Sequence, residues 1–335
     1  VHLHGTGFCY NDTSCLLRSG TPAGSSRMLP GEREFNGFLS ADSGVNPDFH
    51  DWNVAVVNYC DGAAFSGDRD DPVWHNTTAV YYRGARVLDA VVNYLLQSAG
   101  LALADRIVLS GDSAGALAVY LHADHVRSLV PGGVWFKAMA DGGFYLDEKN
   151  VTGGAQWQAA LRGVYDMQHV EGHLDEDCLL AKTRSSKWEC FFPEYAYSYV
   201  TTPLFVINAL YDSWVQRHVL GVSCQPLVCD EALAALREHR RTFLRRTDQV
   251  NRYDKDGMFL TSCYAQGQTV VDGLWADVKV AGQETRRAFA DWYYDRVAPE
   301  ASRRVDCGAG YQCNPTCAAT WARGYNASDY QCGDC

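Results

Sequence analysis

A Gly-x-Ser-x-Gly pentapeptide at residues 111–115 constrains the fold more than any other part of this sequence. It follows the apolar run Arg106 to Ser110 and precedes an apolar helical pattern that begins near Ala114. In a strand–turn–helix context the glycines permit a turn too tight for larger side chains, so the hydroxyl of Ser113 projects at the helix N-terminus. The positive end of the helix dipole favours a developing anion there. The pentapeptide therefore predicts a nucleophilic Ser113; a serine in an ordinary tight turn is the alternative.

Short apolar runs alternate with longer amphipathic stretches along the rest of the 335 residues. Parallel strands joined by crossover helices give this pattern. We therefore predict an α/β fold, α/β-hydrolase-like, with a mainly parallel sheet and helices on both faces, as a single domain over residues 1–335. The predicted strands are Val54 to Tyr59, Arg106 to Ser110, Val134 to Met139, Leu204 to Ile207 and Met258 to Ser262. The predicted helices are Ala79 to Ser98, Ala114 to His125, Glu231 to Arg246, which has a charge-rich outer face, and Glu284 to Val297.

The two ends of the chain differ from its middle. Val1 to Gly5 reads as the end of a strand already under way, and the first residue is not Met. We therefore expect N-terminal strands and a signal peptide to precede this sequence. Residues 305–335 form a Gly- and Cys-rich tail, which we expect disulfides to hold in place.

Charge and hydropathy exclude two classes of partner. A formal net charge of −11 opposes tight binding to nucleic acid, because neutralising phosphates needs clustered Lys and Arg. No apolar stretch approaches the roughly 18 residues that a transmembrane helix requires. We expect neither a nucleic-acid partner nor a membrane span, and no motif implies a metal or an organic cofactor.

Thirteen cysteines, several closely spaced, favour disulfides in an oxidising compartment and hence a secreted protein. Zinc is the alternative, but no C-x-x-C pair is matched by a second at finger spacing. The odd count leaves one thiol free or paired with a cysteine that precedes this sequence. Four N-x-[ST] sequons suit the same compartment and predict glycosylation; they lie at Asn11, Asn76, Asn150 and Asn326.

A second glycine-rich turn, His4-Gly5-Thr6-Gly7, follows the opening strand. Esterases use similar turns to supply the backbone amides of an oxyanion hole. We predict that amides at Thr6 and Gly7, together with that of Ala114, face the ester oxygen as it becomes negative. A glycine-rich turn without this role is the alternative.

Several collinear blocks resemble those of the pectin acetylesterase and Notum family of α/β-hydrolases, and they extend over nearly the whole chain. The resemblance implies a secreted carboxylesterase that deacylates acetyl or acyl esters, with an ester-bearing glycan or an acylated protein as its partner. Together with proximity it favours the disulfides Cys9–Cys15 and Cys178–Cys190. The blocks are residues 3–9, 59–68 (YCDGAAFSGD), 82–86, 110–115, 140–144, 190–193, 208–214 (NALYDSW), 262–265 and 291–294.

The resemblance places the acid of a Ser, Asp, His triad at Asp212, just beyond the strand Leu204 to Ile207. The topology of such folds independently asks for an acid there. The alternative is a helix N-cap, because Asp212 precedes an apolar helical run. Asp141, also just past a strand, is the reserve candidate.

The pattern breaks at Gln266. Where the family keeps its histidine, this chain reads Cys263-Tyr264-Ala265-Gln266-Gly267-Gln268. A glutamine amide cannot accept a proton near neutral pH, so Gln266 cannot serve as the general base. Gly267 replaces a cysteine of the family and removes a possible disulfide beside the same loop.

Three histidines are candidate substitutes for the missing base. His218 and His239 lie on predicted helices, where an exposed histidine is the ordinary interpretation, and His4 lies at the predicted oxyanion turn. An imidazole nitrogen within hydrogen-bonding reach of Ser113 would indicate a relocated base.

Three hypotheses about function follow. The first is an esterase with a relocated or poorly effective base. The second is a pseudoenzyme that binds glycan or ester ligands or serves in an extracellular, cell-wall assembly. The third, an esterase of the hormone-sensitive lipase type, leaves Cys60 to Asp68 and the cysteines unexplained.

Overall fold

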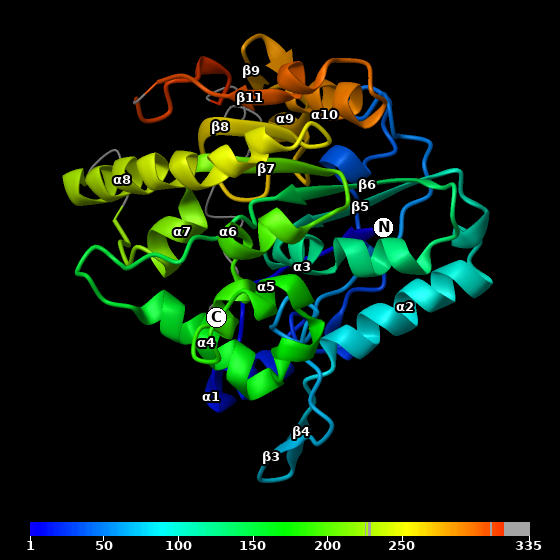
Figure 1. The fold of residues 1–335 in the computed structure, drawn as a ribbon, viewed down its shortest axis with the longest axis vertical. Helices are drawn as coiled ribbons and strands as arrows, with labels where there is room; N and C mark the ends of the chain where they lie inside the picture. Colours follow the sequence, from blue (N-terminus) through cyan, green and yellow to red (C-terminus); the bar gives the residue numbers. More distant parts are fainter. Residues whose placement is uncertain (225, 227–228, 309, 318–335) are drawn as a thin grey trace.

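A seven-stranded parallel sheet forms the centre of the molecule (Figure 1). The computed structural model describes residues 1–224, 226, 229–308 and 310–317. In space the strand order is β11-β8-β7-β6-β5-β1-β2, and every neighbouring pair runs parallel. The strands are β1 (His2–Leu3), β2 (Val56–Val57), β5 (Arg106–Asp112), β6 (Trp135–Asp141), β7 (Leu204–Asp212), β8 (Gly257–Ala265) and β11 (Arg303–Val305). This confirms the predicted α/β class with a mainly parallel sheet.

Two small antiparallel hairpins and the helices complete the described fold. The hairpins are β3 (Val73–His75) with β4 (Thr78–Val80), and β9 (Lys279–Val280) with β10 (Gln283–Glu284). The helices are α1 (Asp12–Ser19), α2 (Gly84–Ser98), α3 (Ala114–Leu129), α4 (Gln156–Gln168), α5 (Glu176–Leu180), α6 (Pro193–Ala196), α7 (Ser213–His218), α8 (Asp230–Thr247), α9 (Asp272–Ala276) and α10 (Thr285–Tyr293). Short 3₁₀ turns lie at Ser26–Met28, Gly37–Leu39, Leu101–Leu103, Val170–His173, Lys187–Phe191, Tyr197–Tyr199, Asp248–Arg252 and Pro299–Ser302.

Helices cover both faces of the sheet, so its central strands are apolar on both sides. Along β7, Leu204 and Val206 point into a core shared with α3, α4 and α8, whereas Phe205 and Ile207 point into a second core. The second core contains Phe289 of α10, whose ring packs edge-on against Phe205. Figure 1 shows α9 and α10 on the opposite side of the sheet from α2 and α3. Burial on both faces explains why these strands read as unbroken apolar runs.

Several predicted elements are wrong in their bounds; the helix Glu284 to Val297 ends at Tyr293, and the strand Leu204 to Ile207 continues to Asp212. The predicted helix from Ala79 begins only at Gly84, because Thr78–Val80 pairs with Val73–His75 in a hairpin. Asn76 adopts a positive φ of 53° at its turn, a conformation that asparagine tolerates better than most residues. The predicted strand Val54 to Tyr59 shortens to two residues that pair only with β1 at the edge of the sheet.

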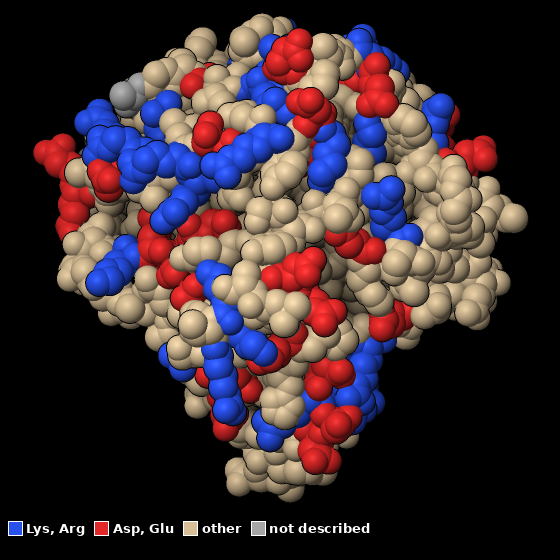
Figure 2. Space-filling view, in the orientation of Figure 1, with Lys and Arg blue, Asp and Glu red and all other residues tan. Residues whose placement is uncertain are grey.

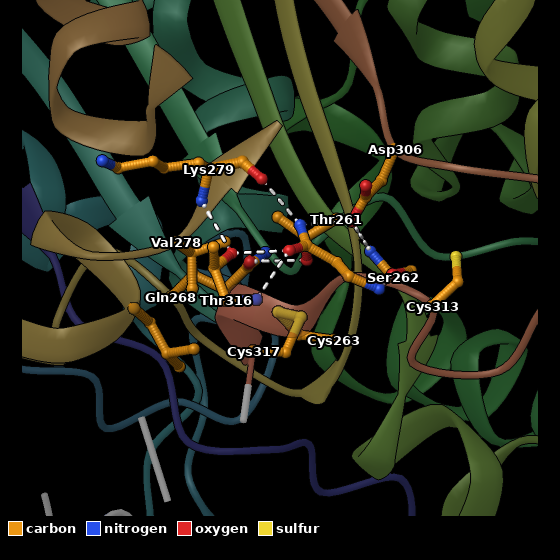
Figure 3. The surroundings of a disulfide bond; sticks show 12 residues. Thr261, Ser262, Cys263, Gln268, Val278, Lys279, Asp306, Cys313, Thr316 and Cys317 are labelled. Carbon is orange, nitrogen blue, oxygen red and sulfur yellow. Dashed lines mark hydrogen bonds between the residues drawn. A yellow bond between two sulfur atoms is a disulfide. The ribbon is translucent and has the colours of Figure 1, made fainter. Parts of the chain in front are cut away.

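Both expected disulfides, Cys9–Cys15 and Cys178–Cys190, are present in the structure. Three further bridges join Cys224 to Cys229, Cys263 to Cys317 and Cys307 to Cys313. Among the described cysteines only Cys60 is a free thiol. The bridge to Cys317 ties the tail to β8 (Figure 3); Cys332 and Cys335 lie outside the described residues.

The predicted glycosylation sites differ in their surroundings. Asn11 and Asn76 are exposed, Asn11 as the N-cap of α1. Asn150 is half-buried, and its side-chain oxygen accepts hydrogen bonds from the backbone of Thr152 and Gly154. Asn326 lies outside the described residues. Glycosylation stays a prediction. Within the described chain, no helix combines the length and apolarity that crossing a bilayer requires.

Candidate active site

Ser113 forms the sharp corner between β5 and α3. It has a φ of 52°, which is rare for a residue with a side chain and costs on the order of 1–3 kcal/mol. Two glycines make this corner possible. A Cβ at Gly115 would lie 1.8 Å from the carbonyl oxygen of Leu3, and one at Gly111 would lie 2.3 Å from that of Gly115. The strained serine at a strand-to-helix corner is the local geometry that the pentapeptide predicted.

The predicted oxyanion turn packs directly against this corner. A Cβ at Gly5 would lie 2.2 Å from the backbone nitrogen of Gly115, so only glycine fits there. The guanidinium of Arg18 donates hydrogen bonds to the carbonyl and hydroxyl oxygens of Thr6, at 2.6 and 2.9 Å. The amide groups of Thr6 and Gly7 have no acceptor among the described residues. Two unsatisfied amides beside a nucleophile suit an oxyanion, although their role stays a prediction.

Asp112 anchors the other side of the turn. One of its carboxylate oxygens accepts hydrogen bonds from the Gly5 amide (3.3 Å), His2 Nε2 (3.0 Å) and His4 Nδ1 (3.2 Å). Burial opposes ionisation of this carboxyl, but the charge of His4 and the two imidazole hydrogen bonds outweigh it and hold the pKa of Asp112 well below its usual range. The turn is thereby tied to the strand that carries Ser113.

The same three side chains form a candidate cation site. Their ligand atoms lie within 4.8 Å of one another, and no other group of the described residues meets this spacing. The imidazole nitrogens are already hydrogen-bonded to the carboxylate, and Arg33 places a positive charge 3.4 Å from His4 Nδ1. A metal ion would have to replace these hydrogen bonds, and the positive charge of the guanidinium would repel it. The cluster therefore fits the role of an anchor for the turn better than that of a metal site.

Two buried aspartates end the neighbouring strands. Asp212 accepts hydrogen bonds from the amides of Trp214 and Val215 through one oxygen, so it caps α7. Its other oxygen is buried and has no partner among the described residues. Burial raises the pKa of Asp212 to about 7, and the charge of nearby Asp141 adds to this. Both the capping role and the position expected of a triad acid are thus compatible with the geometry.

Asp141, the reserve candidate, is held differently. Its Oδ2 accepts hydrogen bonds from the amide and the hydroxyl of Thr269, at 2.6 and 2.8 Å. Burial raises its pKa to about 7 in spite of these bonds. Its backbone carbonyl accepts the amide hydrogen of Ser113 at 2.9 Å. Asp141 therefore couples the nucleophile corner to the loop after β8.

Gln266 lies at the start of that loop, immediately after the end of β8. Its Nε2 donates a hydrogen bond to the carbonyl of Gly142 at 2.9 Å, and its Oε1 is buried without a described partner. The loop is fixed by a hydrogen bond from the Thr261 hydroxyl to Gln268 Oε1 (2.7 Å) and by the Cys263–Cys317 disulfide (Figure 3). Asp112, Asp141, Asp212 and Gln266 therefore all lie at the C-terminal ends of the parallel strands, on the same side of the sheet's strand ends.

Ser113 has no imidazole partner in the structure. All ten histidines of the sequence lie among the described residues, and none of them hydrogen-bonds to Ser113. The hydroxyl instead meets the phenol of Tyr145 at 3.2 Å. The Ser, His, Asp arrangement of an ordinary esterase is therefore not assembled.

Each candidate substitute base is engaged elsewhere. His4 bonds to Asp112, and the ring of His218 stacks on Trp214 at a centroid distance of 4.8 Å. His239 was expected on a helix surface, and this expectation is wrong. Its side chain lies on the buried face of α8, where its Nδ1 pairs with the carboxylate of Glu148 at 2.5 Å.

An aromatic cluster that the sequence analysis missed lies beside Ser113. The ring of Tyr145 packs against Phe8, Trp157 and Trp214, which come from three separate segments. Phe8 follows the oxyanion turn and Trp214 follows Asp212, so their neighbourhood could have been inferred. Trp157 lies on α4, a helix that was not predicted.

Comparisons with known proteins agree with this fold. A family model described as Pectinacetylesterase matches residues 1–318. Pectin acetylesterase 5 of Arabidopsis thaliana is 34% identical over 333 residues, which cover 95% of this chain and 76% of the relative. Palmitoleoyl-protein carboxylesterase NOTUM of Homo sapiens is 27% identical, with 95% and 66% covered. The solved structure of the Wnt deacylase Notum from Drosophila superposes with a TM-score of 0.83 at 24% identity, covering 94% of this chain and 89% of that one.

Proposed function

The chain belongs to the pectinacetylesterase family, and from this premise we propose that it is a slow carboxylesterase that removes acetyl or acyl groups through Ser113. The observation that carries the proposal is Ser113 itself, strained at φ 52° beside a turn whose Thr6 and Gly7 amides are unsatisfied in the described chain. Strain of this kind persists where the surrounding structure maintains it, and it clusters at functional sites.

In the proposed reaction, Ser113 Oγ attacks the ester carbonyl and the carbonyl oxygen becomes an anion. The amides of Thr6, Gly7 and Ala114 and the N-terminus of α3 stabilise that charge. The hydroxyl proton passes to solvent, because the amide of Gln266 cannot accept it. The alcohol leaves with a proton from water, and a second water then hydrolyses the acyl-enzyme.

The missing base sets the expected rate. In subtilisin, loss of the triad histidine costs about 10⁶-fold in kcat, on the order of 8 kcal/mol, while the oxyanion hole and substrate binding still leave about 10³- to 10⁴-fold over water. We therefore expect weak turnover that depends on Ser113. By family membership the substrate class is an ester-bearing glycan such as acetylated pectin; an acylated protein is less favoured, since the identity to the pectin acetylesterases is higher.

A pseudoenzyme is the second candidate function. Two hydrogen bonds favour it: that of Ser113 to Tyr145, and that of Gln266 to the carbonyl of Gly142. The Ser113 hydroxyl and the Gln266 amide then have hydrogen-bond partners within the protein, and the site binds an ester without cleaving it. Such a protein serves as an extracellular binding or cell-wall component.

The compartment proposed for either function is extracellular. Five disulfides within the described residues, Cys9–Cys15 and Cys178–Cys190 among them, are characteristic of secreted proteins. The sequons at exposed Asn11 and Asn76 suit glycosylation there.

One experiment tests both candidates. Initial rates on a small acetyl ester are compared for the wild type, Ser113→Ala, Gln266→His and the double variant. Gln97→His, at an exposed position on α2, is the control for adding an imidazole. The slow-esterase proposal expects wild-type turnover above that of Ser113→Ala, and the pseudoenzyme expects the two to be equal. Both expect Gln266→His to gain about 10²- to 10⁴-fold, the usual contribution of a general base, and to lose it again with Ser113→Ala. No gain would overturn the assignment of Gln266 to the position of the base.

A further inference from the structure

Arginine side chains line the outer face of α8 (Asp230–Thr247). Figure 2 shows them as a continuous row of positive charge at the position of α8 in Figure 1. Between Arg237 and Thr247 the helix has five arginines and one acidic residue, Glu238, although the whole chain has a net charge of −11.

Helix periodicity explains why the row faces outward. Leu236, His239 and Phe243 are buried and hold α8 against the core that also contains α3. Arg237, Arg241 and Arg245 are exposed and follow one another at intervals of four residues. At 1.5 Å of rise per residue these positions lie about 6 Å apart along one face. We call these three residues the arginine stripe.

Few acidic groups neutralise the stripe and its neighbours. Arg241 pairs with Glu238, and Arg246, outside the stripe, pairs with the buried carboxylate of Glu194. Arg245 hydrogen-bonds only to the hydroxyl of Thr242. The guanidinium of Arg237 makes neither a hydrogen bond nor an ion pair with any described residue.

Helix stability does not account for this arrangement. Like charges four residues apart destabilise a helix by a few tenths of a kcal/mol per pair. Cations near the C-terminus of a helix offset part of this cost, but Arg237 and Arg241 lie more than one turn from the end of α8, beyond the reach of that effect. The acidic remainder of the protein does not cancel the local field, because charges are screened over about 8 Å at physiological ionic strength.

We propose that the arginine stripe binds the carboxylates of an unesterified polyuronate chain. A guanidinium holds a carboxylate through two parallel hydrogen bonds, and a regular row of three suits a polymer with a charge on each repeating unit. The choice of polymer rests on the proposed function, which makes a pectin-like glycan the substrate. The buried face of α8 packs in the same core as α3, whose N-terminus carries Ser113, so the polymer and the ester site share one side of the sheet.

The test measures binding of unesterified polygalacturonate, which has no ester for Ser113 to cleave. The variant is Arg237→Gln/Arg241→Gln/Arg245→Gln. The matched control is Arg127→Gln/Arg162→Gln/Arg184→Gln, which removes the same charge from exposed positions on other segments. Circular dichroism verifies folding, and hydrolysis of a small acetyl ester by each variant in the Gln266→His background verifies the site.

We expect the stripe variant to lose at least tenfold in affinity and to retain its ester hydrolysis, and the control to bind as the wild type does. Binding should weaken as salt is raised from 50 to 200 mM, as for other polyanions held by ion pairs. Equal binding by the stripe variant and the control, or equal wild-type binding of polygalacturonate and of heparin, would overturn the proposal. A failure of ester hydrolysis alone counts against the proposed function and leaves the stripe standing.

Discussion

The hydroxyl oxygen of Ser113 lies 3.2 Å from the phenolic oxygen of Tyr145. A phenol is a poor base at neutral pH, so this contact positions the serine without activating it. We predict that Tyr145→Phe changes the rate on a small acetyl ester only a few-fold, whereas Gln266→His raises it by about 10²-fold or more. Initial rates at pH 8 provide the measurement. A loss of 100-fold in Tyr145→Phe would instead show that the phenol takes part in proton transfer.

The second prediction concerns the pH dependence of stability at Asp212. Burial raises its pKa to about 7 in the folded protein, against about 3.9 in the unfolded chain. Between pH 4 and 7 the folded state therefore holds a proton that the unfolded state has lost, and stability falls as pH rises, by up to about 4 kcal/mol.

Asp212→Asn should remove this dependence, because an asparagine oxygen can still cap α7 and carries no charge. Urea unfolding at pH 4, 6 and 8 should show a variant that gains stability relative to the wild type as pH rises. A constant difference across the three values would show that Asp212 ionises without cost.

The contribution of Asp112 to stability should change with pH in the opposite direction, so Asp112 serves as an internal control. Its folded pKa lies below its usual range, so its contribution is complete above the unfolded pKa near 3.9 and is lost as pH falls towards the folded value. Asp112→Asn leaves His2 and His4 without their carboxylate. Hydrogen bonds to a charged group contribute about 1.5–3 kcal/mol each, and we expect a loss of this order at pH 7 that shrinks towards pH 3. A loss that is independent of pH would point to packing rather than charge.

The sequence predicted the parts of the site that depend on local backbone chemistry. The corner at Ser113 and the turn at Gly5 follow from glycines whose close contacts no other residue permits, and such requirements are visible in a single sequence. Side-chain partners between distant segments are not. Tyr145 meets Ser113 only because the loop after β6 packs against the first turn of α3, and the burial of His239 depends on its pairing with Glu148. The helix predicted from Ala79 failed for the same reason, since strand pairing with Val73–His75 overrode its local helical pattern.

The last prediction concerns the loop that carries Gln266. The Cys263–Cys317 disulfide, three residues before Gln266, closes a segment with a sequence separation of 54, whereas Cys307–Cys313 closes one of 6. A disulfide stabilises the folded state by restricting the unfolded chain, and this stabilisation grows with the length of the closed segment. It is about 4 kcal/mol for the long segment and about 2 kcal/mol for the short one. Replacing Cys263 and Cys317 together by alanine should therefore lower the free energy of unfolding more than the same replacement at Cys307 and Cys313. Both cysteines of the long bridge are buried, so lost packing adds to the difference.

In the Gln266→His background, the long-bridge variant should also lose most of the regained hydrolysis, because the new imidazole would no longer be held at the strand end. Retention of full activity would show that the hydrogen bonds from Thr261 to Gln268 and from Thr269 to Asp141 fix the loop without the disulfide.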